Sequence, residues 1–270
     1  MHQPRSDPDP PVLFSTGISG RRGGEVLRLE SEEVRHVRAL RLQPGDPVRL
    51  TDGAGTMWRA RLSPPGGKSV DCVLEEPVGA VSRLPVALAF AVGQKAHVLW
   101  LVEKATELGV ARLCPLEASR SRSVADAGRS AAFWKKAERR AIAALKQSGG
   151  AWLPMLDETL EVSEFLARAS KASGGATGPR VRLDAAGRPL RDVLHTWNGD
   201  LELSLAVGPE GGWTSAEQEA LDAAGYVPAR LGPLVLRFET AALAGLAVAA
   251  QQIITRSGPE SAVRSGSGGG

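Results

Sequence analysis

Several features are scarce or missing in this chain of 270 residues, and each absence excludes a class of protein. Its two cysteines, Cys72 and Cys114, lie far apart and in no metal-ligand spacing, which argues against a disulfide-rich secreted domain and favours the cytoplasm. The first eleven residues lack the apolar core of a secretory signal. The most apolar stretch near the C-terminus, 241–250, is too short to span a bilayer, so we expect no membrane role.

Familiar ligand motifs are missing as well. The chain has no G-x-G-x-x-G fingerprint, which argues against a nucleotide-dependent oxidoreductase, and no G-x-x-x-x-G-K-[ST] loop, which excludes a P-loop protein. His36 has no histidine or cysteine partner at ligand spacing, so we expect no metal site. We interpret His97 and His195 as structural.

The composition is that of an ordinary globular protein that is slightly basic. Hydrophobic residues make up 43% of the chain and charged residues 23%, and the length suffices for a sizeable core. The net charge is only +3, with a pI of about 9.1. Such mild basicity permits a nucleic-acid partner without requiring one.

The pattern of strands and helices divides the chain. Residues 12–80 contain short strands separated by turns, around 26–29, 48–50, 58–62 and 70–74, which predicts a small β-barrel. A short helix over 32–40 would present His36, Arg38 and Arg41. We expect the polar ends, 1–11 and 257–270, to be disordered.

From 84 to 256 the pattern becomes that of an α/β domain. Continuous apolar strands at 86–92, 110–116 and 202–207 alternate with helices, which predicts an open parallel sheet covered on both faces. Further strands are expected at 180–183 and 227–231. Helices are expected at 97–108, 130–148, 163–169 and 240–255, and another begins with a capping box made by Thr214 and Glu217.

Two segments at predicted strand ends are the candidates for chemistry. GPEGG at 208–212 follows an apolar strand, and glycines there let the backbone approach a ligand closely. It could equally be a tight connection in which Glu210 caps the next helix. In LGPLVLRFETA, at 231–241, Arg237 and Glu239 lie among apolar residues. They either pair with each other or cap the last helix, or they face a ligand or a partner subunit.

Both segments closely resemble motifs of the RsmE family, the uridine-N3 methyltransferases of 16S rRNA in the SPOUT superfamily. The resemblance covers roughly 12–256 and includes other segments in the family's order. These are HVRALRLQPGD at 36–46, KATELGV at 104–110, PL at 115–116 followed by RS at 120–121, and Trp134 with the helix end at 141–148.

The resemblance implies a fold that the physical pattern alone does not. It predicts an α/β SPOUT domain over 84–256, with a trefoil-knotted parallel sheet, preceded by a PUA-like RNA-binding barrel over 12–80. Knots are nearly absent from proteins, so this expectation depends on the family alone. The resemblance also implies a homodimer, the cofactor S-adenosyl-L-methionine, and 16S rRNA in the small ribosomal subunit as partner.

The same resemblance implies roles for particular residues. The two segments would hold the cofactor, with Leu183 as a further contact. The predicted cofactor residues are Leu183, Gly208, Pro209, Glu210, Gly211, Gly212, Leu231, Gly232, Val235, Leu236 and Arg237. Arg237 would stabilise the uridine anion, and Glu210 or Glu239 would orient the base or accept its proton. The predicted RNA contacts are His36, Arg38, Arg41, Arg120 and Arg122.

Three positions depart from the family pattern, at Ser119, Gly150 and Phe238. Gly150 stands where the family commonly has arginine, and Phe238 replaces a threonine with a large ring. These differences bear on the identity of the substrate more than on methyl transfer. The alternatives are another SPOUT RNA methyltransferase, with a different base or RNA target, and a non-catalytic RNA-binding protein of the same fold.

Overall fold

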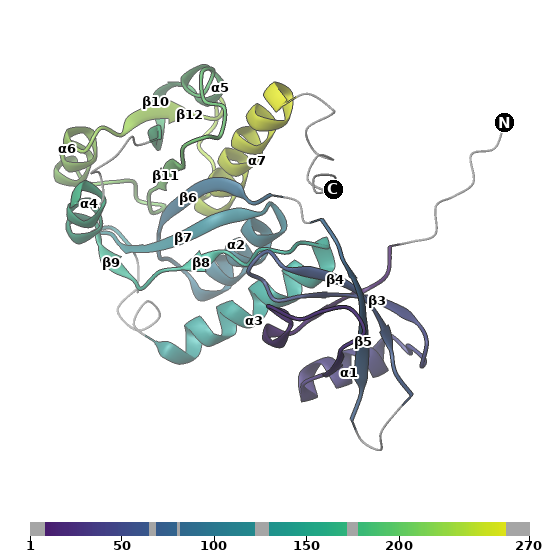
Figure 1. The fold of residues 1–270 in the computed structure, drawn as a ribbon. Coiled ribbons are helices and arrows are strands. Elements are labelled where there is room, and N and C mark those ends of the chain that lie inside the picture. The colour runs from purple at the N-terminus through teal and green to yellow at the C-terminus, as the bar shows by residue number, and fades with distance from the viewer. Residues whose placement is uncertain (1–8, 65–68, 80–81, 122–129, 172–177, 258–270) are drawn as a thin grey trace. The chain divides into compact units, whose positions relative to one another are not determined.

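The computed structural model describes residues 9–64, 69–79, 82–121, 130–171 and 178–257 (Figure 1). The predicted disordered ends lie almost entirely outside this range. The chain divides into two compact units, one comprising 1–82 with 145–152 and the other 83–144 with 153–270. The boundary predicted between 80 and 84 lies near the division at 82–83. The sequence did not predict that 145–152 belongs to the first unit.

The first unit is built on a curled mixed sheet. Its described strands are ordered β1-β3-β4-β5-β2, with β1 and β3 parallel and the other pairs antiparallel. No described pair joins β1 to β2, so the sheet is a half-barrel (Figure 1). The elements are β1 (Val12–Phe14), η1 (Thr16–Ile18), β2 (Val26–Arg28), α1 (Ser31–Ala39), β3 (Pro47–Thr51), β4 (Met57–Leu62) and β5 (Asp71–Pro77).

Alternation of apolar and polar residues explains this sheet. Along β4 the buried residues Trp58, Ala60 and Leu62 alternate with exposed arginines, so one face packs on the core and the other meets solvent. The core joins the inner face to Val34 and Val37 of α1. The segment 145–152 adds an isolated bridge between Ala54 and Trp152.

The second unit is the predicted parallel sheet. Its described strands are ordered β12-β10-β11-β6-β7-β8, with β9 also on β7, and every described pair is parallel. The elements are β6 (Leu84–Ala91), α2 (Lys95–Glu107), β7 (Val110–Glu117), α3 (Ala131–Ser148), β8 (Met155–Leu156), β9 (Leu160–Glu161), α4 (Val162–Lys171), β10 (Arg180–Pro189), α5 (Leu190–Val193), β11 (Leu203–Val207), α6 (Ser215–Ala223), β12 (Val227–Arg230) and α7 (Phe238–Ser257).

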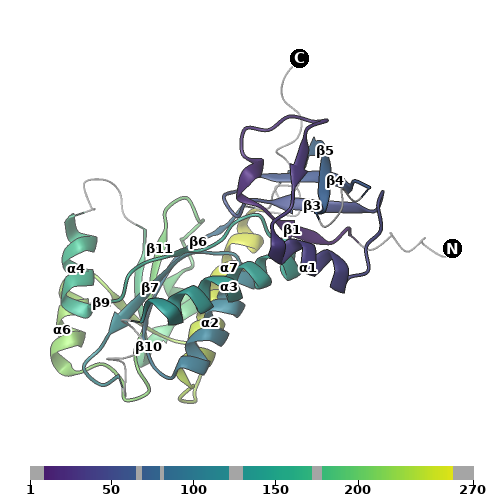
Figure 2. The same cartoon turned by 90° about the horizontal axis from the view of Figure 1, so that it is seen from below.

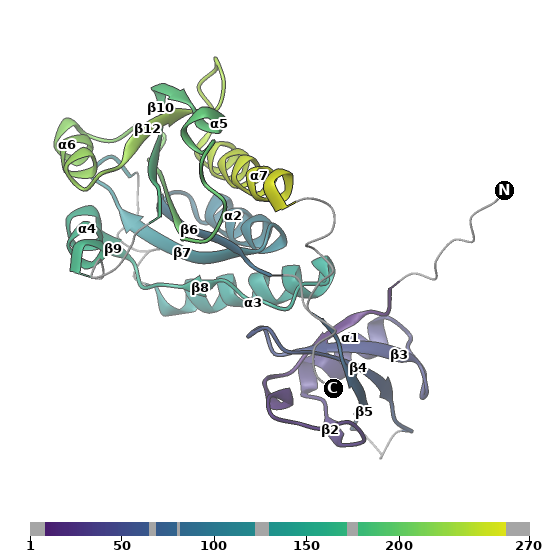
Figure 3. The same cartoon turned by 45° about the horizontal axis from the view of Figure 1, so that its top comes forward.

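Helices cover both faces of this sheet (Figures 2 and 3). Strand β6 shows why, because Leu88 and Phe90 enter one apolar cluster, with α2 and α7, while Ala87 and Ala89 enter another, with α4 and α6. Helix α7 includes an 18-residue stretch, Phe238–Thr255, apolar enough to pass for a membrane span. Its residues Ala242, Leu246 and Ala249 are fully buried in the first cluster, so one face of α7 packs against the sheet, while 33% of the stretch as a whole is buried.

Candidate active site

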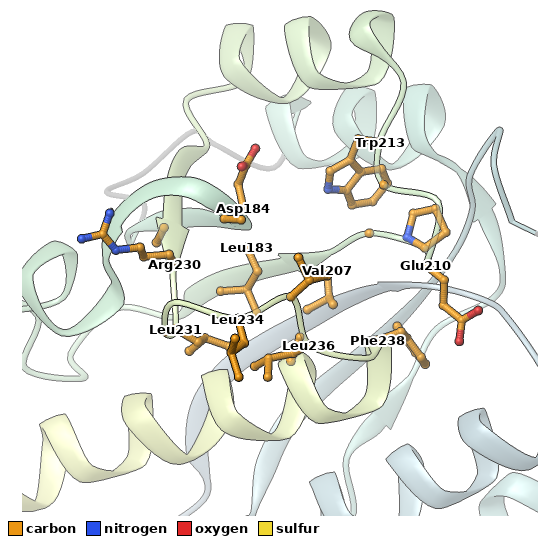
Figure 4. A pocket seen from close by; sticks show the side chains of 18 of the residues that line it. Leu183, Asp184, Val207, Glu210, Trp213, Arg230, Leu231, Leu234, Leu236 and Phe238 are labelled. Atoms are coloured by element: carbon orange, nitrogen blue, oxygen red, sulfur yellow. The ribbon is translucent and has the colours of Figure 1, made fainter.

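A cavity of about 250 Å³ lies where three neighbouring strands of the second unit end. We call it the strand-end cavity. Leu183 follows the last paired residue of β10 on β11, Val207 ends β11, and Leu231 follows β12. Because all three strands are parallel, their carboxyl ends meet at one edge, the position where open α/β sheets bind ligands. Figure 4 shows these side chains around the cavity, with Arg230 and Glu210 at opposite ends.

The turn after β11 is shaped by its glycines. A Cβ at Gly208 would lie 2.9 Å from Nε1 of Trp213, so the indole ring lies directly against the backbone there. Gly212 has a φ of 68°, a conformation that favours glycine. The turn then enters α6 through the predicted capping box, in which Thr214 Oγ1 accepts from the amide of Glu217 at 3.2 Å.

Residues after β7 hold this turn in place. One guanidinium nitrogen of Arg120 donates to the carbonyl oxygens of Gly211 and Trp213, at 3.1 and 3.3 Å. The carboxylate of Glu217 accepts from the amides of Ser119 and Thr214, both at 2.8 Å. Burial of Glu217 raises its pKa, but these hydrogen bonds outweigh the burial and leave the pKa below the ordinary value.

The segment after β12 exposes apolar side chains. Leu234 is 74% exposed and Val235 91% exposed, and both line the strand-end cavity. Arg237 is exposed and has no ion-pair partner within the described residues. It therefore does not pair with Glu239, one of the interpretations that the sequence left open.

A second cavity, of about 220 Å³, adjoins the first. We call it the His97 cavity. It shares Pro209, Glu210 and Phe238 with the strand-end cavity and adds His97 and Arg120 to its lining. Behind His97, Oε2 of Glu239 lies 3.5 Å from the ring nitrogen Nδ1. A carboxylate oxygen of Glu210 lies within 4.8 Å of both groups.

Buried polar atoms without a hydrogen bond gather around these two cavities. Over the described part of the chain such side-chain atoms occur on Glu33, Ser121, Trp213 and Glu239. Trp213 lines the strand-end cavity, Ser121 lines the His97 cavity, and Glu239 lies behind His97. An unsatisfied buried polar group costs about 1–3 kcal/mol. Glu33 is the exception, on α1 of the first unit, and the other three make this edge of the sheet the candidate ligand site.

A third cavity, of about 670 Å³, lies toward the amino ends of the same strands. We call it the Tyr226 cavity. There Ser204 Oγ and the Tyr226 hydroxyl are 2.6 Å apart, and Cys114 Sγ donates to Asp157 at 3.2 Å. Burial raises the pKa of the Cys114 thiol, so it stays protonated and unreactive. This cavity is larger, and its hydroxyl, thiol and guanidinium groups have partners among the described residues.

Comparison with known proteins identifies the family. The profile of an RNA methyltransferase domain matches residues 81–250, and that of an RNA methyltransferase PUA domain matches 29–75. The chain is 32% identical over 213 residues to a ribosomal RNA small subunit methyltransferase E from Synechocystis, covering 78% of this chain and 67% of the relative. The chain belongs to the RsmE family of RNA methyltransferases. A Mycobacterium bovis relative of the same name is 29% identical, with coverages of 83% and 85%.

Solved structures share the fold of this chain. A probable rRNA-methyltransferase from Porphyromonas gingivalis is 27% identical, with a TM-score of 0.71 over 90% of this chain and 96% of that one. A ribosomal RNA small subunit methyltransferase E from Neisseria gonorrhoeae, bound to S-adenosyl methionine, has a TM-score of 0.76 at 24% identity. The coverages are 88% of this chain and 95% of that one. The predicted fold class, with its SPOUT-type sheet and PUA-like first domain, is confirmed.

Most residues that the RsmE resemblance singled out for the cofactor lie together. The residues that line the strand-end cavity are Leu183, Gly208, Pro209, Glu210, Gly212, Leu231, Gly232, Val235 and Leu236. Gly211 lines the His97 cavity instead. Arg237 lines neither cavity. Glu210 borders both cavities, while Glu239 is mostly buried behind His97.

The predicted RNA contacts are more scattered. Arg38 and Arg41 are exposed at the end of α1 and just after it. His36 is half-buried, and its pKa is lowered by burial and then by the charge of Lys146. Arg120 holds the glycine turn through its carbonyl oxygens. Arg122 lies outside the described residues.

Several lining residues were missed by the sequence analysis. They include Asp184, Trp213, Gln218 and Arg230. Asp184 could have been found, because it directly follows the predicted strand end at Leu183. His97 was interpreted as structural, yet it lines a cavity beside the glycine turn. Its partner Glu239 is distant in the chain, so no local motif connects them.

Proposed function

We propose that this protein transfers the methyl group of S-adenosyl-L-methionine to N3 of a uridine in 16S rRNA of the small ribosomal subunit. The observation that carries the proposal is the strand-end cavity, formed by a glycine turn and two further strand ends in a chain of the RsmE family. The cofactor is supported by a relative of the same fold, the Neisseria gonorrhoeae enzyme, solved with S-adenosyl methionine.

The residues of the strand-end cavity suit this cofactor. Leu183, Val207 and Leu236 offer apolar contacts for a purine ring, and Gly208 allows close approach of the backbone. The Trp213 indole N–H is buried without an acceptor, which a cofactor oxygen or nitrogen can supply. The Ala186 amide, and then the Arg182 guanidinium with which Asp184 forms an ion pair, hold the pKa of Asp184 below its ordinary value, so this wall of the cavity carries a charge that is already paired.

The reaction needs little from the protein beyond placement and proton handling. The bound cofactor supplies an electrophilic methyl group on a sulfonium. Uridine N3 carries a proton and becomes a nucleophile only when that proton leaves. Arg237 is the sequence-based candidate for stabilising the resulting anion. It is exposed, has no ion-pair partner in the described chain and lines neither cavity, so this role requires the segment after β12 to move toward the base. Glu210 or Glu239 orients the base or accepts the proton.

RNA binding extends the proposal to the first unit, the PUA-like domain over 12–80. The exposed Arg38 and Arg41, with His36, Arg120 and Arg122, contact RNA phosphates, so binding weakens as salt rises. The target uridine leaves its stack to reach the cavity. The proposal also includes a trefoil knot in 84–256, a homodimer and a cytoplasmic location, all from the family resemblance.

The test is methylation of small ribosomal subunits from a strain lacking the gene. Purified protein and labelled S-adenosyl-L-methionine are added, and the digested RNA is analysed by mass spectrometry. Appearance of 3-methyluridine supports the proposal, and Arg237→Ala is expected to lower the rate. A different methylated base would replace the uridine assignment, and absence of cofactor binding would favour a non-catalytic RNA-binding protein.

A further inference from the structure

The His97 cavity adjoins the strand-end cavity through Pro209, Glu210 and Phe238, and its other side chains, His97 among them, are not part of the predicted cofactor site. We propose that this cavity receives the uracil ring, that His97 takes the N3 proton, and that Glu239 is the positioning residue for His97. This inference rests on the proposed function and names the group that the reaction requires.

The arrangement of His97 and Glu239 suits proton transfer. Glu239 lies in the first turn of α7, its side chain is 12% exposed, and its Oε2 is 3.5 Å from His97 Nδ1. A carboxylate beside Nδ1 favours the tautomer with the proton on that nitrogen. Nε2 is then left as a proton acceptor, on a side chain that lines the cavity. A base oriented by a third group is the usual arrangement in acid–base catalysis.

The other walls of the cavity suit a uracil ring. Over the described residues the Ser121 hydroxyl oxygen is buried without a partner, and Gln94 also lines the cavity, so both side chains can donate to uracil carbonyl oxygens. Pro209 and Phe238 offer apolar surfaces. Phe238 replaces the family's threonine, and its ring packs against Phe90, with centroids 6.2 Å apart.

Charged groups face His97 from each element around it. Glu239 comes from α7, Glu210 from the turn after β11, and Arg120 from the segment after β7. Lys95, on the same helix as His97, is exposed. The two carboxylates stabilise a protonated imidazole, which is the state that His97 reaches after taking the proton.

The proton and the electrons balance in a single displacement. His97 Nε2 accepts the proton from N3, and the N3–H electron pair stays on nitrogen. That pair forms the new bond to the methyl carbon, while the electrons of the broken carbon–sulfur bond remain on sulfur. The imidazolium then returns its proton to water, and no oxidant or metal is required.

The decisive variant is His97→Asn, which keeps a polar side chain beside Glu239 but has no basic nitrogen. We expect kcat to fall about 100-fold, the usual scale for a general base, with the dissociation constant for S-adenosyl-L-methionine changed less than twofold by calorimetry. His195→Gln, at an exposed histidine outside both cavities, is the matched control and keeps the wild-type rate.

Two further measurements separate proton transfer from a structural role. Substrate RNA containing 5-fluorouridine has a more acidic N3, so the defect of His97→Asn becomes at least tenfold smaller on it. Nitrogen-15 NMR reads which ring nitrogen of His97 carries the proton. We expect Nδ1 in the wild type and a mixture of tautomers in Glu239→Gln.

Several results would overturn the inference. They are a wild-type rate in His97→Asn, a proton on Nε2, or loss of activity in EDTA that a divalent cation restores, since His97, Glu210 and Glu239 would then be metal ligands. These results all require a wild-type enzyme that makes 3-methyluridine. If the wild type makes none, the proposed function fails first, and the two failures are distinguishable.

Discussion

The strand-end cavity and the Tyr226 cavity lie toward opposite ends of one parallel sheet and differ in how their polar groups are satisfied. The Tyr226 cavity is the larger, at about 670 against 250 Å³. Its hydroxyl, thiol and guanidinium groups bond to one another or to backbone carbonyls, as Arg180 does to Ala224 at 2.8 Å. Around the strand-end cavity, the Trp213 indole nitrogen remains buried and unpaired.

The difference in hydrogen bonding between the two cavities indicates the ligand site better than the difference in their volumes does. A fold tolerates the cost of an unpaired buried group when a ligand later satisfies it, whereas paired groups already contribute to folding. The carboxyl ends of the strands also carry the glycines that admit a ligand. Substitutions at the strand-end cavity are therefore expected to change ligand affinity, and those at the Tyr226 cavity to change stability.

The largest effect is expected for Gly208→Val. A Cβ there would lie 2.9 Å from Trp213 Nε1 and 3.0 Å from Cε2, and the rigid indole cannot yield without moving the turn. We expect affinity for S-adenosyl-L-methionine to fall at least 100-fold, about 2.7 kcal/mol, in calorimetry. Gly79→Val is the control, because a Cβ at that residue meets nothing within 4 Å. A dissociation constant within threefold of wild type would remove the turn from the site.

Arg120→Ala is expected to have a smaller effect. The variant loses two charge-assisted hydrogen bonds, to Gly211 and Trp213, so the turn loosens and affinity for the cofactor falls about tenfold. The sequence analysis predicted that Arg120 contacts RNA. If that role dominates, the KM for small subunits rises instead, while calorimetry with the cofactor is unchanged. Arg139→Ala, at an exposed arginine on α3, is the control.

The sequence pattern predicted those features of the sheet and of the strand-end cavity that depend only on neighbouring residues in the chain. The apolar runs in β6, β7 and β11 indicated strands buried on both faces, and Thr214 with Glu217 marked the start of α6. The glycine turn was recognisable because glycine at a strand end has a direct backbone consequence. These features require only neighbours along the chain.

The remaining features depend on contacts between distant segments. Strand β10 extends to Pro189, past the predicted end at Leu183, because pairing with β12 resumes at Arg188 after an irregularity. The short β1, β8, β9 and α5 carry too few residues for a periodic signal. The contact of His97 with Glu239 joins α2 to α7, and only tertiary packing creates it.

Glu217→Gln tests the hydrogen bonds by which the Glu217 carboxylate holds the glycine turn. The pKa of Glu217 is lowered in the folded protein, so its ionised form contributes stability above the ordinary glutamate pKa of 4.5. We expect the variant to be about 1–2 kcal/mol less stable at pH 7 in urea unfolding. The difference from wild type shrinks as pH falls through the lowered folded-state pKa. Glu219→Gln, exposed on the same helix, shows no such gap, and a gap independent of pH would contradict this account.

The smallest effect is expected for Tyr226→Phe, in the larger cavity. The substitution removes the hydroxyl that lies 2.6 Å from Ser204 Oγ, and unfolding in urea should show a loss of about 1 kcal/mol. Combining it with Ser204→Ala costs less than the sum of the two single changes, because neither partner is then left unpaired. Cofactor affinity stays within twofold of wild type throughout. A tenfold loss of affinity would show that the paired groups of the Tyr226 cavity also serve the ligand site, and the contrast between the two ends of the sheet would fail.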